Sequence, residues 1–372
     1  MDITRITDMF TKLVETDSIS FGERQMADIL TAELENLGFE VFEDDAGRNL
    51  GSDTGNLYAF LKGTDSSRKP VLLSAHMDTV VPGIGKKALI DHDKGIITSS
   101  GDTILGADDL AGVVQILEAV RTVIENGSPR GDIEILFTVA EEVYGKGAAA
   151  FDYSRIISDS AYVMDLSEGI GIAAVAAPSI ISFAFEIHGR SAHAGFEPEA
   201  GINAIAVASQ IISATPQGRL TDDITFNIGT ISGGSISNIV SDSCICKGEV
   251  RGLDHEAACA VLDDLRNRID RICAEAGAKY TFSSEVMIHA YRTDETSDVC
   301  RLFADVCRSI GLEPVFTSTR AGSDNNIFAL HDLPGIVVGC GSRNTHTIDE
   351  YINLDDLYKG AELVEKLLTF PL

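Results

Sequence analysis

The spacing of apolar side chains divides the chain into segments of two kinds. Residues 3–15, 22–37 and 109–126 repeat their apolar positions every three or four residues, which predicts helices. Shorter apolar runs predict strands at 39–42, 55–63, 70–80, 133–139 and 162–165. Strands that alternate with helices are typical of an α/β fold. We therefore predict a doubly wound, mostly parallel sheet with helices on both faces.

The middle of the chain follows a different order. The pattern there predicts, in sequence, a strand at 180–189, a helix at 201–214, strands at 224–232 and 241–253, a helix at 255–276 and a strand at 279–291. This β-α-β-β-α-β order is that of a ferredoxin-like unit. We expect a separate domain at 178–291, inserted into a larger domain formed by residues 1–177 and 292–372.

Composition narrows the class of protein. Of the 372 residues, 44% are hydrophobic, so the chain can bury a core. The net charge is −28, so the chain should repel nucleic acids and acidic membranes. The first twenty residues lack the apolar core of a signal peptide, and no uncharged apolar run reaches eighteen residues. The seven cysteines show no paired spacing, which fits reduced thiols. We expect a soluble cytoplasmic protein.

Candidate chemistry begins at the end of the strand at 70–80, with His76 and Asp78. Residues two apart on a strand share a face, so His76 could bind a metal while Asp78 accepts the other ring N–H. Glu141 and Glu142 directly follow another apolar strand. Neighbouring residues point apart, so one can be a metal ligand and the other a base.

Three further residues complete the candidate set. Asp108 and Asp109 follow a glycine turn at a predicted helix start, Asp165 ends a strand, and His346 precedes the last helix. Each has an ordinary alternative, such as a helix cap or a solvated loop. Together they offer five nitrogen and oxygen ligands without a thiolate: His76, Asp108, Glu142, Asp165 and His346. Such a set favours a hydrolytic two-zinc site, although cobalt or manganese would also fit.

The segments HMDTV, GADD, AEE and NTHTIDE, with Asp165 between the last two, resemble those of a family of di-zinc peptidases. That family includes glutamate carboxypeptidase, aminoacylase and peptidase T, and LGADDLAG is most similar to the peptidase T branch. The resemblance covers essentially the whole chain. One position departs from it, because Leu110 stands where peptidase T relatives commonly have lysine. Because of this departure, the resemblance is weaker support for expecting the tripeptide specificity of peptidase T in this chain.

The resemblance implies a role for each candidate. Asp108 would bridge two metals, with His76 and Asp165 on one and Glu142 and His346 on the other. The resemblance also implies that Glu141 is the general base and that Asp78 supports His76. It further implies that the peptide bond between Asp108 and Asp109 is cis.

The inserted domain carries two further matches. His193 in SAHAG and Asn238 in GGSISNIV resemble residues of the family's lid, which in dimeric relatives reach the neighbouring subunit's active site. The resemblance thus implies a homodimer formed through this lid domain. Arg320 in TRAGSD resembles part of the family's substrate pocket, and Arg251 is another candidate for binding a substrate carboxylate. Surface or interdomain ion pairs are the alternative for both.

The leading expectation is a two-zinc aminopeptidase that acts on tripeptides or similar short peptides. A deacylase or carboxypeptidase acting on N-acyl amino acids or dipeptides is the nearest alternative, because the same metals would serve both. A non-catalytic binding protein on the same fold is a third reading. Loss of Glu141 or of the bridging aspartate would favour that reading, and both residues are present.

Overall fold

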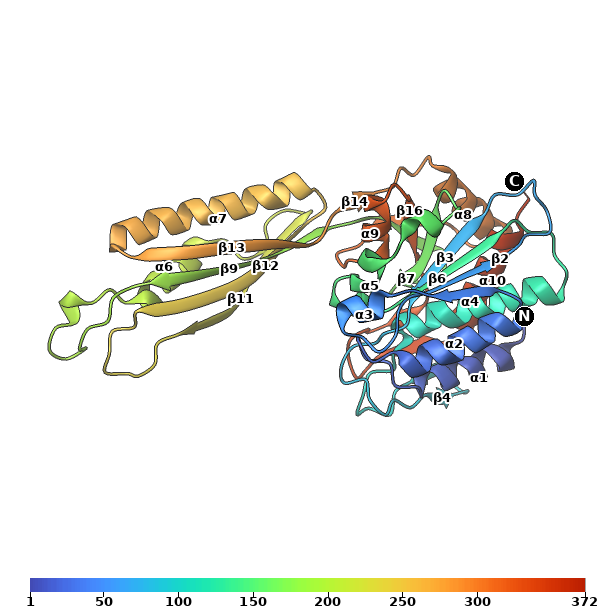
Figure 1. Cartoon of the computed structure of the whole chain (residues 1–372), viewed down its shortest axis with the longest axis horizontal. Helices are drawn as coiled ribbons and strands as arrows, with labels where there is room; N and C mark the ends of the chain where they lie inside the picture. Colours follow the sequence, from blue (N-terminus) through green and yellow to red (C-terminus); the bar gives the residue numbers. More distant parts are fainter. Residues whose placement is uncertain (372) are drawn as a thin grey trace. The chain divides into compact units, whose positions relative to one another are not determined.

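The computed structural model describes residues 1–371, which form two compact units (Figure 1). The larger unit comprises Met1–Ala176, Arg292–Thr319 and Ser323–Leu372, and the smaller comprises Ala177–Tyr291 with Arg320–Gly322. Each has its own hydrophobic core. The smaller unit begins one residue before the predicted boundary. It also includes Arg320–Gly322, a segment that the sequence pattern placed in the larger domain.

A nine-stranded sheet forms the centre of the larger unit. Its strands follow one another in the order β1 (Glu40–Glu43), β2 (Leu57–Leu61), β6 (Ile133–Thr138), β3 (Val71–His76), β7 (Ala161–Leu166), β16 (Gly335–Gly339), β8 (Ile172–Ala177) and β14 (Tyr291–Arg292), with β15 (Val315–Ser318) paired to β8. The four central strands β6, β3, β7 and β16 run parallel, whereas β1 and β2 pair antiparallel to their neighbours. Strand β8 pairs antiparallel to β16 and parallel to β15. The predicted mostly parallel α/β sheet is confirmed.

Helices of the larger unit pack against this sheet and one another. They are α1 (Ile3–Val14), α2 (Arg24–Asn36), α3 (Ala46–Leu50), α4 (Ala107–Glu125), α5 (Lys146–Ala150), α8 (Asp298–Ser309), α9 (Asp324–Leu330) and α10 (Leu354–Thr369). Helix α4 contacts β3, β7, α1 and α10, and is buried along most of its length. A Cβ at Gly112 would lie 2.3 Å from the carbonyl oxygen of Met164, so glycine allows α4 to lie directly on β7. This contact fixes the start of α4 near the strand ends.

The smaller unit is an antiparallel sheet with two helices. Its strands lie in the order β10 (Gly218–Arg219), β11 (Ile224–Gly233), β12 (Ser243–Gly252), β9 (Ser179–His188) and β13 (Lys279–Ile288). Helices α6 (Ala204–Ala214) and α7 (His255–Ala276) share a core with the sheet. Buried and less buried residues alternate along β9, as expected for a sheet covered on one face. The predicted β-α-β-β-α-β order is confirmed, with β10 as a short addition.

Several short elements were not predicted. They form a four-stranded sheet whose strands are β17 (Ser342–Arg343), β18 (Tyr351–Asn353), β5 (Ile96–Thr98) and β4 (Leu89–Asp91), and the six-residue strand β8 was not predicted either. Two or three residues are too few for a period of two to be visible in the sequence. This small sheet positions the loop between β17 and β18, which carries His346. Within residues 1–371, no helix is both long and apolar enough to cross a membrane.

Candidate active site

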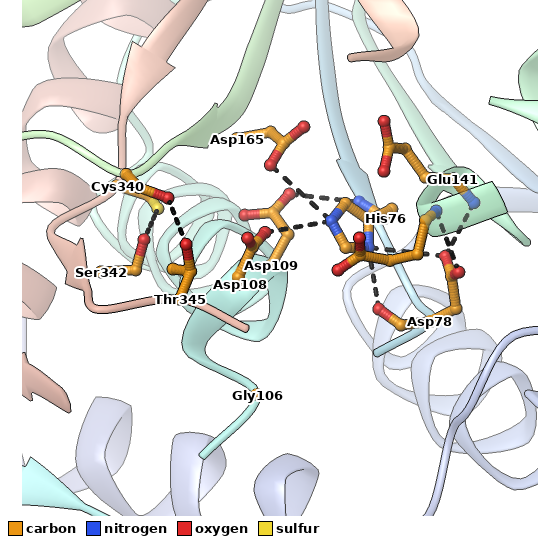
Figure 2. A network of polar contacts seen from close by, with 12 residues as sticks. His76, Asp78, Gly106, Asp108, Asp109, Glu141, Asp165, Cys340, Ser342 and Thr345 are labelled. Carbon is orange, nitrogen blue, oxygen red and sulfur yellow. Dashed lines mark hydrogen bonds and ion pairs between the residues drawn. The ribbon is translucent and has the colours of Figure 1, made fainter. Parts of the chain in front are cut away.

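Most of the candidate residues lie at the carboxyl ends of the parallel strands, and Figure 2 shows His76, Asp108, Glu141 and Asp165 in one place. His76 is the last residue of β3, Asp165 lies near the end of β7, and Glu141 and Glu142 form the short 3-10 helix η1 (Glu141–Val143) after β6. Asp108 lies in the first turn of α4. Because these strands are parallel neighbours, their carboxyl ends meet at one edge of the sheet, where ligands bind in open α/β folds.

Asp108 lies between the two histidines. Its Oδ1 is 3.2 Å from Nε2 of His76, and its Oδ2 is 3.3 Å from Nε2 of His346. The peptide bond between Asp108 and Asp109 is cis, as the resemblance implies. One carboxylate oxygen thus faces each imidazole, which is the arrangement that a bridging ligand requires.

The other acidic residues complete two overlapping groups. Oε1 of Glu142 lies 3.0 Å from Nε2 of His346, and Oδ1 of Asp165 lies 3.7 Å from Nε2 of His76. Ligand atoms of His76, Asp108 and Glu142 lie within 4.8 Å of one another, and so do those of His76, Glu141 and Asp165. The structure therefore places all five predicted ligands in one cluster, with Glu141 beside them.

The contacts of Asp78 differ from those predicted. Nδ1 of His76 is 2.8 Å from the backbone oxygen of Asp78 and 3.5 Å from its Oδ1, so the ring's hydrogen bond goes to the carbonyl. The carboxylate instead accepts the N–H groups of Glu141 and Glu142, at 2.9 and 3.2 Å, and the hydroxyl of Ser20, at 2.7 Å. Asp78 thus supports both His76 and the glutamate pair.

Two residues that sequence reasoning missed hold the preceding part of this loop. Oδ1 of Asn56 accepts the N–H of Val139 at 3.1 Å, and Oε1 of Glu23 accepts that of Ala140 at 3.0 Å. Together with Asp78, they bind four successive backbone N–H groups, from residue 139 to residue 142. Ala140 has a φ of 51°, a left-handed conformation that is costly for a residue with a Cβ and is common near active sites.

Backbone N–H groups of the segments that carry candidate ligands are also held by carboxylates. Glu350 accepts the N–H groups of Gly106 and Asp108, at 2.6 and 3.1 Å, and Oδ2 of Asp109 accepts that of His76 at 3.1 Å. Glu350 was not predicted, because its role depends on a contact between segments more than 240 residues apart. These contacts fix the backbone from which the candidate ligands project.

The electrostatics of the cluster follow from its burial. Burial raises the pKa of Asp165 to about 8, with help from the charges of Asp108 and Glu142 and against the contact with His76. Contacts with Asp108 and then Glu142 raise the pKa of His346 to about 10. Burial alone would lower the pKa of His76, but its carboxylate neighbours raise it well above its ordinary value. The cluster therefore favours positive charge at both imidazoles.

This donor set fits two divalent metal ions. Imidazole nitrogens and carboxylate oxygens without a thiolate are ligands that zinc, cobalt and manganese accept. The three carboxylates of Asp108, Glu142 and Asp165 lie around two histidines in a mostly buried place. Cations bound there would offset the excess negative charge, in place of the protons that the histidines otherwise hold.

The smaller unit brings the two predicted lid residues together. The backbone oxygen of Asn238 accepts the N–H of Ala194 at 3.0 Å, and His193 forms a β-bridge with Ile239. Nδ1 of His193 accepts the N–H groups of Gly195 and Phe196, at 3.1 and 3.2 Å. In the neutral ring the proton is therefore on Nε2, which makes that nitrogen a hydrogen-bond donor.

The two candidate arginines lie close together in the smaller unit. Nε of Arg251 donates to Glu249 at 2.7 Å, and its Nη1 donates to the backbone oxygen of Arg320 at 3.1 Å. Nη2 of Arg320 donates to the backbone oxygen of Asp222. Arg251 thus forms an ion pair within this unit, as its alternative reading expects, whereas the partner of Arg320 is a backbone oxygen.

The cluster contains the kinds of ligand that a metal-dependent hydrolase would need. Residues 72–369 match the model of Peptidase family M20/M25/M40, so the chain belongs to this family and is a peptidase. The match to the family model begins at residue 72. It therefore does not include Ser20, Glu23 and Asn56, whose side chains contact the loops of the site.

Relatives with similar length support this assignment. The uncharacterized protein YqjE of Bacillus subtilis is 34% identical over 364 residues, which cover 98% of this chain and 97% of that protein. The crystal structure of aminopeptidase PepT from Bacillus cereus is 35% identical, with a TM-score of 0.93 over 99% of this chain and 98% of its own. A tripeptidase from Staphylococcus aureus is 31% identical, with a TM-score of 0.96 over the same shares.

Proposed function

We propose that this protein is a two-metal aminopeptidase that releases the N-terminal residue of tripeptides, with zinc as the metal. The observation that carries the proposal is the position of Asp108, with one carboxylate oxygen toward each of His76 and His346. The likeness to an aminopeptidase and a tripeptidase over nearly the whole chain supports the substrate class.

The ligands divide into two groups around Asp108. His76 and Asp165 would hold one metal ion, Glu142 and His346 would hold the other, and Asp108 would bind both. When bound, the two ions would polarise the scissile carbonyl and make a water molecule more acidic. Asp109 and Glu350 hold the backbone N–H groups of His76 and Asp108, so both ligands start from fixed positions.

Glu141 is the residue that we assign as the general base. Glu142 contacts His346 directly, as a ligand of the same ion would, whereas Glu141 shares no hydrogen bond with either histidine among those of the described chain. Burial and the nearby charge of Asp165 raise the pKa of Glu141 well above its ordinary value, which suits a proton acceptor. Glu141 would take the proton of the attacking water and pass it to the nitrogen of the departing amine.

We assign a role in substrate binding to the two lid residues, His193 and Asn238. With its proton on Nε2, His193 can donate a hydrogen bond to the oxygen that becomes negatively charged as the amide is attacked. Exposed apolar side chains support a homodimer through the smaller unit, because Phe196, Ile231 and Ile236 expose most of their side chains.

The cysteines support a cytoplasmic location. All seven are free thiols, and six of them are buried, as expected for a protein of a reducing compartment. We therefore assign the enzyme to the cytoplasm, with short peptides as its substrates.

The nearest alternative is a deacylase or carboxypeptidase, in which Arg251 or Arg320 would bind the substrate carboxylate. The deciding experiment offers zinc-loaded protein four substrates: a tripeptide, its N-acetyl form, a dipeptide and an N-acetyl amino acid. An aminopeptidase should prefer the free tripeptide, because a site that binds a charged amine leaves polar groups unpaired when that amine is acylated. Equal or faster cleavage of the acetylated compounds would replace the aminopeptidase assignment with the alternative.

A further inference from the structure

We propose that Glu23 is a positioning residue for Glu141, acting through the backbone of Ala140. This inference rests on the proposed role of Glu141 as the base. Glu23 is 0% exposed, and its Oε1 accepts the N–H of Ala140, the residue directly before Glu141. Its Oε2 accepts the hydroxyl of Ser52 at 3.1 Å, so both oxygens of the carboxylate are engaged.

Glu23 belongs to a segment that is anchored to the site's strand. The backbone oxygen of Ser18 accepts the N–H of Thr79, and Ile19 forms a parallel β-bridge with Thr79, just beyond His76 and Asp78. Ser20 donates its hydroxyl to Asp78 at 2.7 Å. Residues 18–23 therefore carry two side chains, those of Ser20 and Glu23, to the hydrogen-bond system that holds the glutamate loop.

The conformation of Ala140 explains why this hydrogen bond matters. A φ of 51° is unfavourable for alanine, so the surrounding contacts must hold the residue there. Glu23 binds the N–H of this residue, and Asp78 binds the next two N–H groups. Without Glu23, Asn56 would still bind the N–H of Val139 and Asp78 those of the next two residues, but the N–H of Ala140 between them would lose its acceptor. Ala140 could then relax and carry Glu141 with it. Displacement of a catalytic group by about 1 Å can lower turnover by up to roughly 100-fold.

Two variants separate position from charge. Glu23→Asp keeps the charge but withdraws the oxygens by one methylene, whereas Glu23→Gln keeps an acceptor in place and removes the charge. Glu134→Asp is the matched control. Glu134 is also 0% exposed, and its carboxylate also accepts backbone N–H groups, those of Ile157 and Ser158. It lies near the opposite end of β6 from the glutamate loop. We expect Glu23→Asp to lower kcat by about tenfold or more, with KM within about twofold and unchanged metal content. Glu23→Gln should remain within about threefold of the wild type, and Glu134→Asp within about twofold.

Amide hydrogen exchange of metal-free protein gives a readout that does not depend on activity. A peptide covering residues 139–145 should exchange faster in Glu23→Asp than in the wild type, and at the wild-type rate in Glu23→Gln and Glu134→Asp. Unchanged exchange and kcat in Glu23→Asp, or greater impairment of Glu23→Gln, would overturn the inference. If the wild type cleaves no peptide, the proposed function fails, and the exchange experiment still decides whether Glu23 holds the loop.

Discussion

Oδ1 of Asp78 accepts the backbone N–H of Glu141 over 2.9 Å. The aspartate expected only to orient a histidine therefore also fixes the residue that we assign as the general base. Its second oxygen accepts the N–H of Glu142 and the hydroxyl of Ser20. A single buried carboxylate thus couples the strand that ends at His76 to the loop that follows β6.

Replacing Asp78 with asparagine should impair turnover. The amide has one acceptor oxygen, so its NH2 group would face a backbone N–H of Glu141 or Glu142, and two donors cannot form a hydrogen bond. We expect kcat to fall by roughly 10- to 100-fold, with weaker metal binding. Asp132→Asn is a suitable control, because Asp132 also accepts a backbone N–H, that of Gly63, near the start of β6. Equal kcat in the two variants would contradict this role for Asp78.

The two adjacent glutamates should respond differently to the same change. Glu141→Gln removes the proposed base, so turnover should fall by roughly 10²–10⁴-fold while metal content stays near that of the wild type. Glu142→Gln removes a proposed ligand beside His346 and should lower the metal content. Steady-state kinetics and metal analysis on the same samples distinguish them. Exchanged phenotypes would reverse the assignment, and small equal effects would exclude both roles.

The parts of this molecule that could be predicted from the sequence are those with a local pattern. Long helices and strands repeat apolar residues at a fixed spacing, and His76, Glu142 and Asp165 stand at strand ends where acidic and imidazole groups are conspicuous. The positions of Glu23 and Asn56 could not be predicted in this way. Each acts by accepting a backbone N–H from a loop more than 80 residues away, which leaves no spacing to detect.

The contacts of Asp78 and of the two candidate arginines could not be predicted either, because they depend on how the chain is arranged in space. The sequence pattern suggested that the Asp78 carboxylate accepts the His76 ring N–H, but a strand pattern indicates a shared face and not which acceptor is nearer. Arg251 and Arg320 were candidates for binding a substrate carboxylate, and the structure gives both guanidinium groups partners within the smaller unit. The residue type does not indicate which groups a side chain contacts.

Stability should depend on the ionisation of Glu23. Burial, together with the nearby charge of Asp78, raises the pKa of Glu23 from 4.5 to about 7. Between these pH values the folded protein keeps a proton that the unfolded chain has released, so stability falls as the pH rises. Urea unfolding of metal-free protein at pH 4.5 to 7 should show a steeper loss of stability for the wild type than for Glu23→Gln. Equal slopes would show that Glu23 does not titrate in this range.

The smaller unit's sheet ends on β13 at one edge and on β10 and β11 at the other, and we expect the β11 edge to form the dimer contact. Within residues 1–371, strand β10 pairs only with Thr225 and Phe226 of β11, and the Gln217 side chain accepts the N–H of Ile228. In this part of the chain, one edge of residues 229–233 is therefore left for a second copy. Light scattering at micromolar concentration should give twice the 39.7 kDa chain mass. Ile231→Lys should shift this mass toward the monomer. Ile157→Lys in the larger unit should not, although Ile231 and Ile157 have similar exposed fractions, 52% and 53%. A monomeric wild type would exclude the contact.

Metal titration tests the two-metal site around Asp108 most directly. Protein stripped by a chelator and shown to be metal-free should not cleave a tripeptide, and zinc, cobalt or manganese should restore cleavage. Bound metal should rise to two ions per chain, and Asp108→Asn should bind less metal because it loses the proposed bridging carboxylate. Full activity in protein that contains no metal would contradict the proposed mechanism.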